Sequence, residues 1–330
     1  MKRYPLKLSG IPKQAIWGGT RLKRDYGKKA DFDAIAESWE LSVREGATNL
    51  VENGCGAGRS LAECLSEMGF DAVQPGYDGK VFPLLIKLID AESPLSVQVH
   101  PDDAYAKAKG VGNGKTEMWV VIDAKPGAEL VMGLADGVNR AGFSIAVAEK
   151  KFDGVMKRVP VKAGDVFFIP SGMLHAIGGG ILIAEVQQNC DTTYRVWDYD
   201  RRDKEGNLRP LHVKEALDVV RPFAEGECDA IRFEGKVTLL PGETLANCRY
   251  FEVSRLAVSR KTDFPVPADR FTHLLVLDGA VTVSGSGETV ECRAGDSVLI
   301  PAGTENPTLD GNALVLLSCP KGEQSSPAGK

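Results

Sequence analysis

Several features that would place this chain in a common class of protein are missing from its sequence. No apolar run approaches the roughly 20 residues that a helix needs to cross a bilayer. No run of lysine and arginine suggests a nucleic-acid partner, and the net charge is −5. Residues 1–19 contain Lys2 and Arg3 without an apolar core behind them, so we do not expect a signal peptide. Neither nucleic acid nor a membrane is therefore expected as a partner.

Cysteine and histidine are present but sparsely placed. The seven cysteines are odd in number and contain no Cys-x-x-Cys pair, which argues against a disulfide framework and against a Cys-bound zinc. Scattered reduced thiols of this kind predict a cytoplasmic protein. The chain has four histidines. We interpret His212 as a helix-start residue and His273 as a relic in a second repeat, which leaves two histidines to explain.

The stretch 95–100 carries the strongest local pattern. Read as a strand, it places apolar and polar side chains on opposite faces. Three polar side chains on one face either meet water or line a polar cavity that holds an ion or a substrate. The apolar face has Leu95, Val97 and Val99, and the polar face has Ser96, Gln98 and His100.

Lys87 interrupts the otherwise apolar run 81–90. A buried ammonium needs an anionic partner or ligand, whereas a lysine near the edge of a sheet extends its amine to solvent. The sequence leaves both interpretations open. Lys115 and Glu117 share one face of the next predicted strand, 115–122, so polar side chains recur on a strand that is otherwise apolar.

Periodicity predicts a mainly β chain with a few short helices. Helical spacing covers 58–68, 104–108, 140–158 and 211–220, and strand patterns cover 35–42, 81–90, 166–169 and 180–187. A hairpin is expected over 272–283.

The last third of the chain repeats the middle. Residues 163–172 reappear as 294–303, a shift of 131 residues, and the same shift places Asn306 opposite His175. A repeat of this length predicts two similar β units, of which only the first keeps a histidine at this turn. We expect a catalytic domain over 1–225, a degenerate second domain over 226–319 and a disordered tail over 320–330.

These motifs lead to a family resemblance. The spacing of Gly164, Pro170, Gly172 and His175 resembles the second motif of cupins, which are double-sheet jelly rolls. The first cupin motif is altered, and in this form the chain resembles type I phosphomannose isomerase (mannose-6-phosphate isomerase), especially its short bacterial form. The resemblance implies two cupin-type jelly-roll β-barrels with a few short helices between. The other matching segments are 17–19, 36–42, 95–102, 115–118 and 187–195.

The resemblance also implies one zinc ion per chain, held by Gln98, His100, Glu117 and His175. Zinc accepts imidazole and carboxylate ligands and, in catalytic sites, keeps a position for water or substrate. Because no thiolate takes part, a harder metal also fits. Taken singly, each histidine could be a satisfied core residue and Glu117 could pair with Lys115.

The implied reaction interconverts mannose 6-phosphate and fructose 6-phosphate by moving a proton between C1 and C2 through a cis-enediol. A metal helps by stabilising the developing enediolate oxygen. The base stays open among Glu185, a metal-bound water and another group beside the metal. Arg195 resembles the family's essential arginine, and a buried ion pair with Asp191 or Asp198 is its structural alternative. The implied catalytic residues are Arg195, Glu185 and Lys115, and the implied substrate contacts are Trp17, Lys87, Ser96 and Arg201.

Two other functions remain open at this point. Two histidines and a carboxylate also suit Fe(II), which would make the chain a cupin oxygenase. A non-catalytic cupin that binds sugar phosphates is the second alternative. The lysine and arginine side chains and the glutamine ligand speak against the oxygenase. A homodimer is left open, because the sequence does not report the oligomeric state, and specificity among hexose phosphates is open too.

Overall fold

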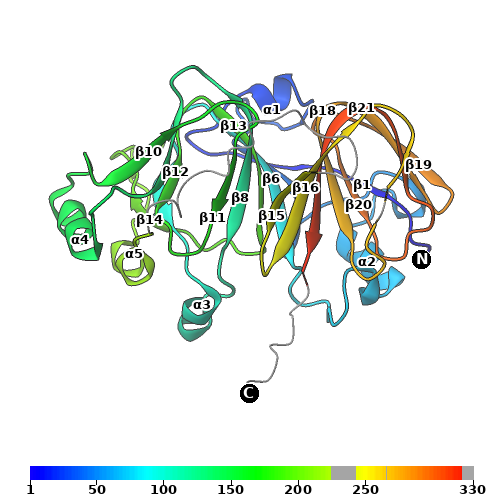
Figure 1. The fold of residues 1–330 in the computed structure, drawn as a ribbon, viewed down its shortest axis with the longest axis horizontal. Coiled ribbons are helices and arrows are strands. Elements are labelled where there is room, and N and C mark those ends of the chain that lie inside the picture. The colour runs from blue at the N-terminus through cyan, green and yellow to red at the C-terminus, as the bar shows by residue number, and fades with distance from the viewer. Residues whose placement is uncertain (224–242, 265, 322–330) are drawn as a thin grey trace.

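The structure, a computed structural model, describes residues 1–223, 243–264 and 266–321. The predicted domain boundary at 225 and nearly all of the predicted tail lie outside the described residues. The mainly β class is confirmed, with the first unit and the C-terminal unit side by side (Figure 1). None of the described helices is long and apolar enough to cross a membrane.

The first unit consists of two sheets. One contains, in spatial order, β10 (Met156–Pro160), β9 (Glu129–Leu134), β12 (His175–Ile177), β7 (Val97–Val99) and β14 (Tyr194–Trp197). The other contains β11 (Val166–Ile169), β8 (Glu117–Ala124), β13 (Ile181–Gln188), β6 (Leu84–Ala91), β3 (Glu37–Leu41) and β2 (Ile11–Lys13). A short hairpin joins β4 (Val43–Arg44) to β5 (Ala47–Thr48).

The C-terminal unit is built around one large sheet. Its order is β1 (Leu6–Leu8), β20 (Ser297–Ile300), β18 (Thr272–Gly285), β21 (Thr308–Pro320), β16 (Phe251–Val258) and β15 (Glu243–Asn247). In addition, β17 (Thr262–Asp263) pairs with β21 and β19 (Glu288–Arg293) pairs with β18. The first strand of the chain thus belongs to the sheet formed by the last third, with Leu6 opposite Leu299.

Short helices occupy the edges and connections. They are α1 (Arg21–Arg24), α2 (Leu61–Met68), α3 (Asp103–Lys109), α4 (Arg140–Glu149) and α5 (Val213–Val219), with 3₁₀ turns η1 (Gly54–Gly56) and η2 (Phe70–Ala72).

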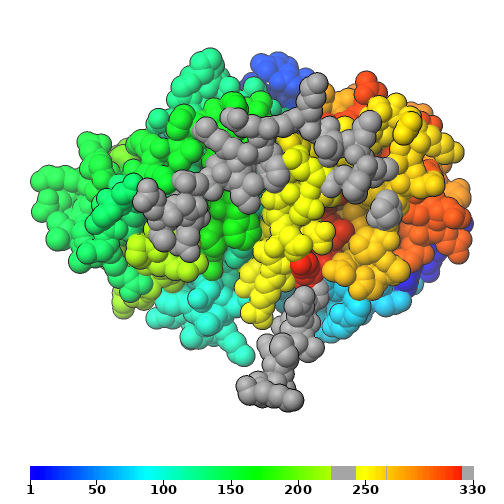
Figure 2. All heavy atoms as spheres, viewed as in Figure 1, coloured from blue at the N-terminus to red at the C-terminus, as the bar shows by residue number. Residues whose placement is uncertain are grey.

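The central strand β6 is buried on both faces, which explains its nearly continuous apolar sequence. On its outer face, Ile86 and Leu88 share a core with Leu275 and Leu316 of the C-terminal sheet. On its inner face, Ile89 belongs to the core between the two sheets of the first unit. The two units therefore meet through a hydrophobic interface, and Figure 2 shows them in contact across the middle of the molecule.

The internal repeat is confirmed by the strands. β11 and β20 start and end at positions related by the 131-residue shift. Gly164 and Gly295 hold the same positive φ, 91° and 89°, which a residue with a side chain rarely adopts. The turn before each of these strands therefore has one backbone geometry, and each turn is built on a glycine for that reason.

The predicted helix over 140–158 is too long. α4 ends at Glu149, Lys150 adopts the left-handed conformation with φ of 54°, and the chain then enters strand β10. Phe152 and Met156 nevertheless pack in the same core as Phe143 of the helix. Their apolar spacing imitates a longer helix because the chain turns back onto that core.

Two strand predictions also need correction. The segment 272–283 is not a hairpin: β18 runs unbroken, and its pairing with β21 shifts between Val276 and Asp278, which makes Leu277 the extra residue of a bulge. A Cβ on Gly279 would lie 2.1 Å from the carbonyl oxygen of Asn312, so glycine serves close packing here and not a turn. Leu95 does not share the core of Val97 and Val99; it lines a cavity on the polar side, because the strand begins only at Val97.

Helix α2 starts with a capping box. The Ser60 hydroxyl accepts a hydrogen bond from the Glu63 N–H at 3.3 Å, and the Glu63 carboxylate accepts one from the Ser60 N–H at 2.9 Å. We expect Ser60→Ala to lower the free energy of unfolding by about 1 kcal/mol with kcat unchanged. Denaturant unfolding measures the first and a steady-state assay the second. Ser66→Ala, an exposed serine in the same helix, is the control, and an equal loss in both variants would contradict the cap.

Candidate active site

The two sheets of the first unit present polar side chains to the space between them. On one sheet, His175 lies opposite Gln98, and Gln98 lies opposite Arg195 on its other side. Residues that are paired directly across antiparallel strands point to the same face. The register alone therefore gathers Gln98, His175 and Arg195 on one face, as the alternation of 95–100 predicts for Gln98.

The facing sheet supplies the acidic groups. Glu185 lies between Lys87 and Trp119 in the register, and Gln187 lies opposite Glu117. All of these side chains are buried. Alternate positions on these strands carry the apolar core, so the sheet places a polar row within an otherwise hydrophobic interior.

His100, Glu117 and His175 form a compact buried cluster. Ligand atoms of the three residues all lie within 4.8 Å of one another. The Nε2 atom of His100 is 3.6 Å from Glu117 Oε2, and that of His175 is 3.4 Å from Glu117 Oε1. Two imidazoles and a carboxylate at these distances are the donor set of many catalytic metal sites.

Hydrogen bonds fix the tautomer of both histidines. His100 Nδ1 lies 2.9 Å from the Thr192 carbonyl oxygen, and His175 Nδ1 lies 2.9 Å from that of Met173. A carbonyl only accepts, so Nδ1 carries the proton and the lone pair of Nε2 faces the cluster. Burial lowers the pKa of His175 to about 4 and that of His100 well below its ordinary value. Both rings are therefore neutral and ready to bind a cation.

The cluster fits a metal ion on direct structural grounds. Among the described residues, Glu117 Oε1 and the Nε2 atom of His175 are buried without a hydrogen-bond partner, and Glu117 Oε2 has the Lys115 amine at 2.6 Å. Such atoms cost stability unless a cation or donor satisfies them. Burial raises the pKa of Glu117 to about 7, because a charged carboxylate at this place lacks the solvation that water would give it. His100 Nε2 lies 3.2 Å from the Lys115 amine, so ligation by His100 requires that Lys115 give up this contact.

Lys87 is buried among carboxylates, which settles the question that its sequence left open. Its amine lies 3.3 Å from Glu37 and 3.3 Å from Glu185. Burial alone would lower the pKa of Lys87, but the two carboxylates outweigh that effect and raise it. Burial would likewise raise the pKa of Glu185, yet Lys115 and Lys87 hold it below its ordinary value. Both groups are therefore charged at neutral pH.

A cavity of about 530 Å³ adjoins the cluster. Lys115 connects the two, because it lines the cavity and lies 2.6 Å from Glu117 Oε2. A volume of this size accommodates a small polar ligand. Its lining includes seven of the predicted site residues: Trp17, Lys87, Ser96, Gln98, Lys115, Glu185 and Arg195.

Arg201 is placed differently from the other predicted contacts. It does not line this cavity, and its guanidinium bonds the Pro94 carbonyl and Asp198. Arg209 and His212 line the cavity in its place, although the sequence did not point to them as ligand contacts. His212 does precede α5, as predicted, but its Nδ1 accepts a hydrogen bond from the Arg195 N–H.

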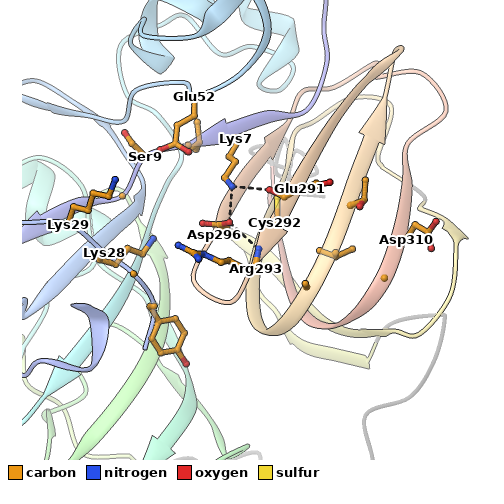
Figure 3. Close-up of a pocket in the computed structure, with 18 residues that line it drawn as sticks. Lys7, Ser9, Lys28, Lys29, Glu52, Glu291, Cys292, Arg293, Asp296 and Asp310 are labelled. Carbon is orange, nitrogen blue, oxygen red and sulfur yellow. Dashed lines mark hydrogen bonds and ion pairs between the residues drawn. The ribbon is translucent and has the colours of Figure 1, made fainter. Parts of the chain in front are cut away.

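A second cavity, of about 740 Å³, lies between the start of the chain and the C-terminal unit (Figure 3). Two of the four cations that line it are already paired: Lys7 with Asp296 at 2.8 Å, and Lys28 with the buried Glu40 at 2.7 Å. The metal-competent cluster found among the described residues adjoins the smaller cavity. The smaller cavity is therefore the better candidate for chemistry.

Comparison with known proteins shows the family of the chain. A family model described as "Phosphomannose isomerase type I, catalytic domain" matches residues 6–141, and "Mannose-6-phosphate isomerase, cupin domain" matches 242–320. The chain is 36% identical to the probable mannose-6-phosphate isomerase GmuF of Bacillus subtilis, over 96% of this chain and 99% of the relative. The chain belongs to the type I phosphomannose isomerase family.

Another curated relative and two solved structures are also similar to this chain. Mannose-6-phosphate isomerase ManA of B. subtilis is 35% identical over 96% of this chain and 99% of its own. A solved B. subtilis mannose 6-phosphate isomerase superposes with a TM-score of 0.85 at 31% identity, covering 96% and 99% of the two chains. A solved mannose 6-phosphate isomerase bound with zinc and yttrium shares the fold, with a TM-score of 0.75 at 16% identity. The cupin-type fold expected from the sequence is confirmed.

Proposed function

We infer that this protein interconverts D-mannose 6-phosphate and D-fructose 6-phosphate. The observation that carries the inference is the buried His100–Glu117–His175 cluster beside a cavity lined by Lys87, Lys115 and Arg195. An aldose–ketose isomerase must stabilise negative charge on substrate oxygens while a proton moves between neighbouring carbons. A cluster suited to a cation, next to buried basic side chains, meets that requirement.

We propose zinc as the resident metal, held by His100, Glu117, His175 and Gln98. Two imidazoles and a carboxylate suit zinc, and Gln98 faces the same space from the strand beside His175. The distant relative that was crystallised with zinc supports the choice. When bound, the ion would stabilise the charge that develops on the substrate oxygens.

The chain's own residues supply the remaining requirements. Glu185 is ionised, lies 4.0 Å from the Lys115 amine and faces the cavity, so we assign it the transfer of the proton. Lys115 offers an ammonium to a substrate oxygen. Arg195 hydrogen-bonds Ser96 Oγ at 3.2 Å and the Pro210 carbonyl, and it has no ion pair with Asp191 or Asp198 among its described contacts. We therefore propose that Arg195 contacts the substrate and does not form a structural ion pair.

The alternatives receive less support. An Fe(II) oxygenase does not require a cavity lined by lysines and arginines, and the four curated relatives that match carry the name mannose-6-phosphate isomerase. A non-catalytic binding protein would not need Glu185 held ionised between two lysines at a metal cluster. We further propose that the protein works in the cytoplasm, where its free thiols would stay reduced.

The decisive experiment is an isomerase assay on the zinc-loaded protein with a panel of hexose phosphates. We expect formation of fructose 6-phosphate from mannose 6-phosphate, loss of that activity on treatment with a chelator, and its return when zinc is added back. Oxygen uptake in the same mixture should stay at the level without protein. Oxygen consumption without isomerisation would refute the assignment.

A further inference from the structure

We propose that Arg209 is a specificity-determining residue that binds the phosphate of the substrate, and that Arg201 holds the structure around it. The proposal rests on the proposed isomerase function and identifies which end of the cavity takes the anion. It starts from three arginines, Arg195, Arg201 and Arg209, that surround a single carboxylate, Asp198.

The charges of this cluster do not balance. Asp198 is 4% exposed and receives hydrogen bonds from both Arg201 and Arg209. Burial lowers the pKa of Arg195, and the neighbouring Arg209 and Arg201 lower it further. Two guanidinium groups bond the one carboxylate, and Arg195 lies nearby without an ion pair of its own, so positive charge is left over at one end of the cavity. A phosphate monoester carries about −1.5 to −2 at neutral pH, which matches that excess.

The hydrogen bonds separate the roles of the two arginines. Arg201 donates hydrogen bonds from Nε to the Asp198 carbonyl, from Nη1 to the Pro94 carbonyl and from Nη2 to the Asp198 carboxylate. Arg209 donates hydrogen bonds to the Asp198 carboxylate from Nε, at 2.7 Å, and from Nη2. Its Nη1 has no protein partner among the described contacts, and Arg209 lines the cavity whereas Arg201 does not.

Arg195 offers a matching group. Its Nε and Nη1 bond Ser96 Oγ and the Pro210 carbonyl, which leaves Nη2 without a partner among the described contacts. Pro210 directly follows Arg209, so the same contact places the two arginines next to each other. Two fixed guanidinium groups with spare donors at one end of a cavity suit phosphate oxygens. The other end, near Lys87, Lys115 and Glu185, is then left for the reacting carbons.

Arg209→Ala tests the assignment, with Arg202→Ala as the matched control. Arg202 lies on the same loop, is exposed and does not line the cavity, and its guanidinium hydrogen-bonds the Gly206 carbonyl without another side-chain contact among the described residues. The probes are inorganic phosphate, titrated into the zinc-loaded full-length chain by calorimetry, and kcat/KM for mannose 6-phosphate against unphosphorylated mannose. Losing one charge-assisted contact should weaken phosphate binding, and lower kcat/KM for mannose 6-phosphate, by about 10- to 100-fold. The preference for mannose 6-phosphate over mannose, as the ratio of the two kcat/KM values, should fall in Arg209→Ala, and Arg202→Ala should match the wild type.

Arg209→Gln tests whether the effect of Arg209→Ala comes from a loss of folding. Glutamine still offers hydrogen-bond donors to Asp198, whose contact with Arg201 is unchanged, but the positive charge at position 209 is lost. The same loss of phosphate affinity in a variant with an unchanged melting temperature supports the proposal. Phosphate affinity within threefold of the wild type in either folded variant overturns it. If phosphate binding depends on Arg209 while no hexose phosphate is isomerised, the anion site stands and the proposed function fails.

Discussion

His175→Ala should lose the bound metal and, with it, about a thousand-fold or more of kcat, because a metal contributes several kcal/mol to the stabilisation of charge in a transition state. The Nε2 atom of His175 has no hydrogen-bond partner among the described residues, so the change deprives the ion of a ligand, and the protein hydrogen bond that is lost is the one from Nδ1 to the Met173 carbonyl. Metal content by elemental analysis, measured beside kcat, checks both losses. Full metal retention with lost activity would show that His175 is not a ligand.

The fold should survive this change. His175 opens strand β12, whose backbone pairs with β7 and β9 independently of the imidazole. Truncating one buried ring to alanine leaves a cavity but no unpaired charge. We expect the metal-free forms of the variant and the wild type to melt within a few degrees of each other. Unfolding of the variant at room temperature would mean that the ring is primarily a core residue.

The repeat provides the matched control. Asn306 occupies the position equivalent to His175 and adopts φ of 47°, so Asn306→Gly avoids backbone strain that alanine would introduce. We expect its kcat within about twofold of the wild type, since surface substitutions away from special features change little, and one metal ion per chain. A second bound ion that this change removes would reveal a site in the C-terminal unit.

Much of this architecture follows from local patterns in the sequence. Strand β11 was predicted at its observed bounds because a glycine turn precedes it and a proline follows it. The repeat was visible because one glycine-based turn is used twice. The metal cluster was implied by the family resemblance, and the polar alternation of 95–100 and the shared face of Lys115 and Glu117 agree with it.

Other features depend on distant contacts that no local pattern reports. Residues 150–158 have helical spacing, but the backbone leaves the helix at Lys150 and turns back, which brings their apolar side chains into the core beside α4. β1 joins the C-terminal sheet through pairing with β20, almost 300 residues later in the chain. Arg209 comes from an irregular segment that tertiary hydrogen bonds hold in place, among them the one from Arg195 to Pro210. Its role could not be read without the structure.

Glu185→Gln should lower kcat by about a thousand-fold, within the range of general acid–base contributions, while metal content stays at one ion per chain. Glutamine keeps an oxygen for the Trp119 indole, which donates to Glu185 at 2.9 Å, but it cannot take a proton. It also removes one of the two negative charges beside Lys87. Part of any loss could therefore come from electrostatics around that lysine and not from missing proton transfer.

Glu37 separates these two causes because its surroundings match those of Glu185 closely. Each carboxylate lies 3.3 Å from the Lys87 amine, and each accepts from an indole, Trp39 to Glu37 at 2.7 Å. Both line the cavity, but of the two only Glu185 has a recorded contact with Lys115 at the metal cluster. Glu37→Gln should therefore impose the same electrostatic change on Lys87 and lower kcat by no more than about tenfold.

A further measurement follows the proton itself. In deuterated water, the wild type should exchange the C2 proton of mannose 6-phosphate with solvent, and Glu37→Gln should do so nearly as fast. Glu185→Gln should lose exchange and turnover to the same extent, because both require removal of that proton. If the large loss appears in Glu37→Gln while Glu185→Gln still exchanges, the proton transfer belongs to Glu37. Equal, modest losses in both variants would mean that both carboxylates act through their charge on Lys87. The group that takes the proton would then be another one at the metal cluster.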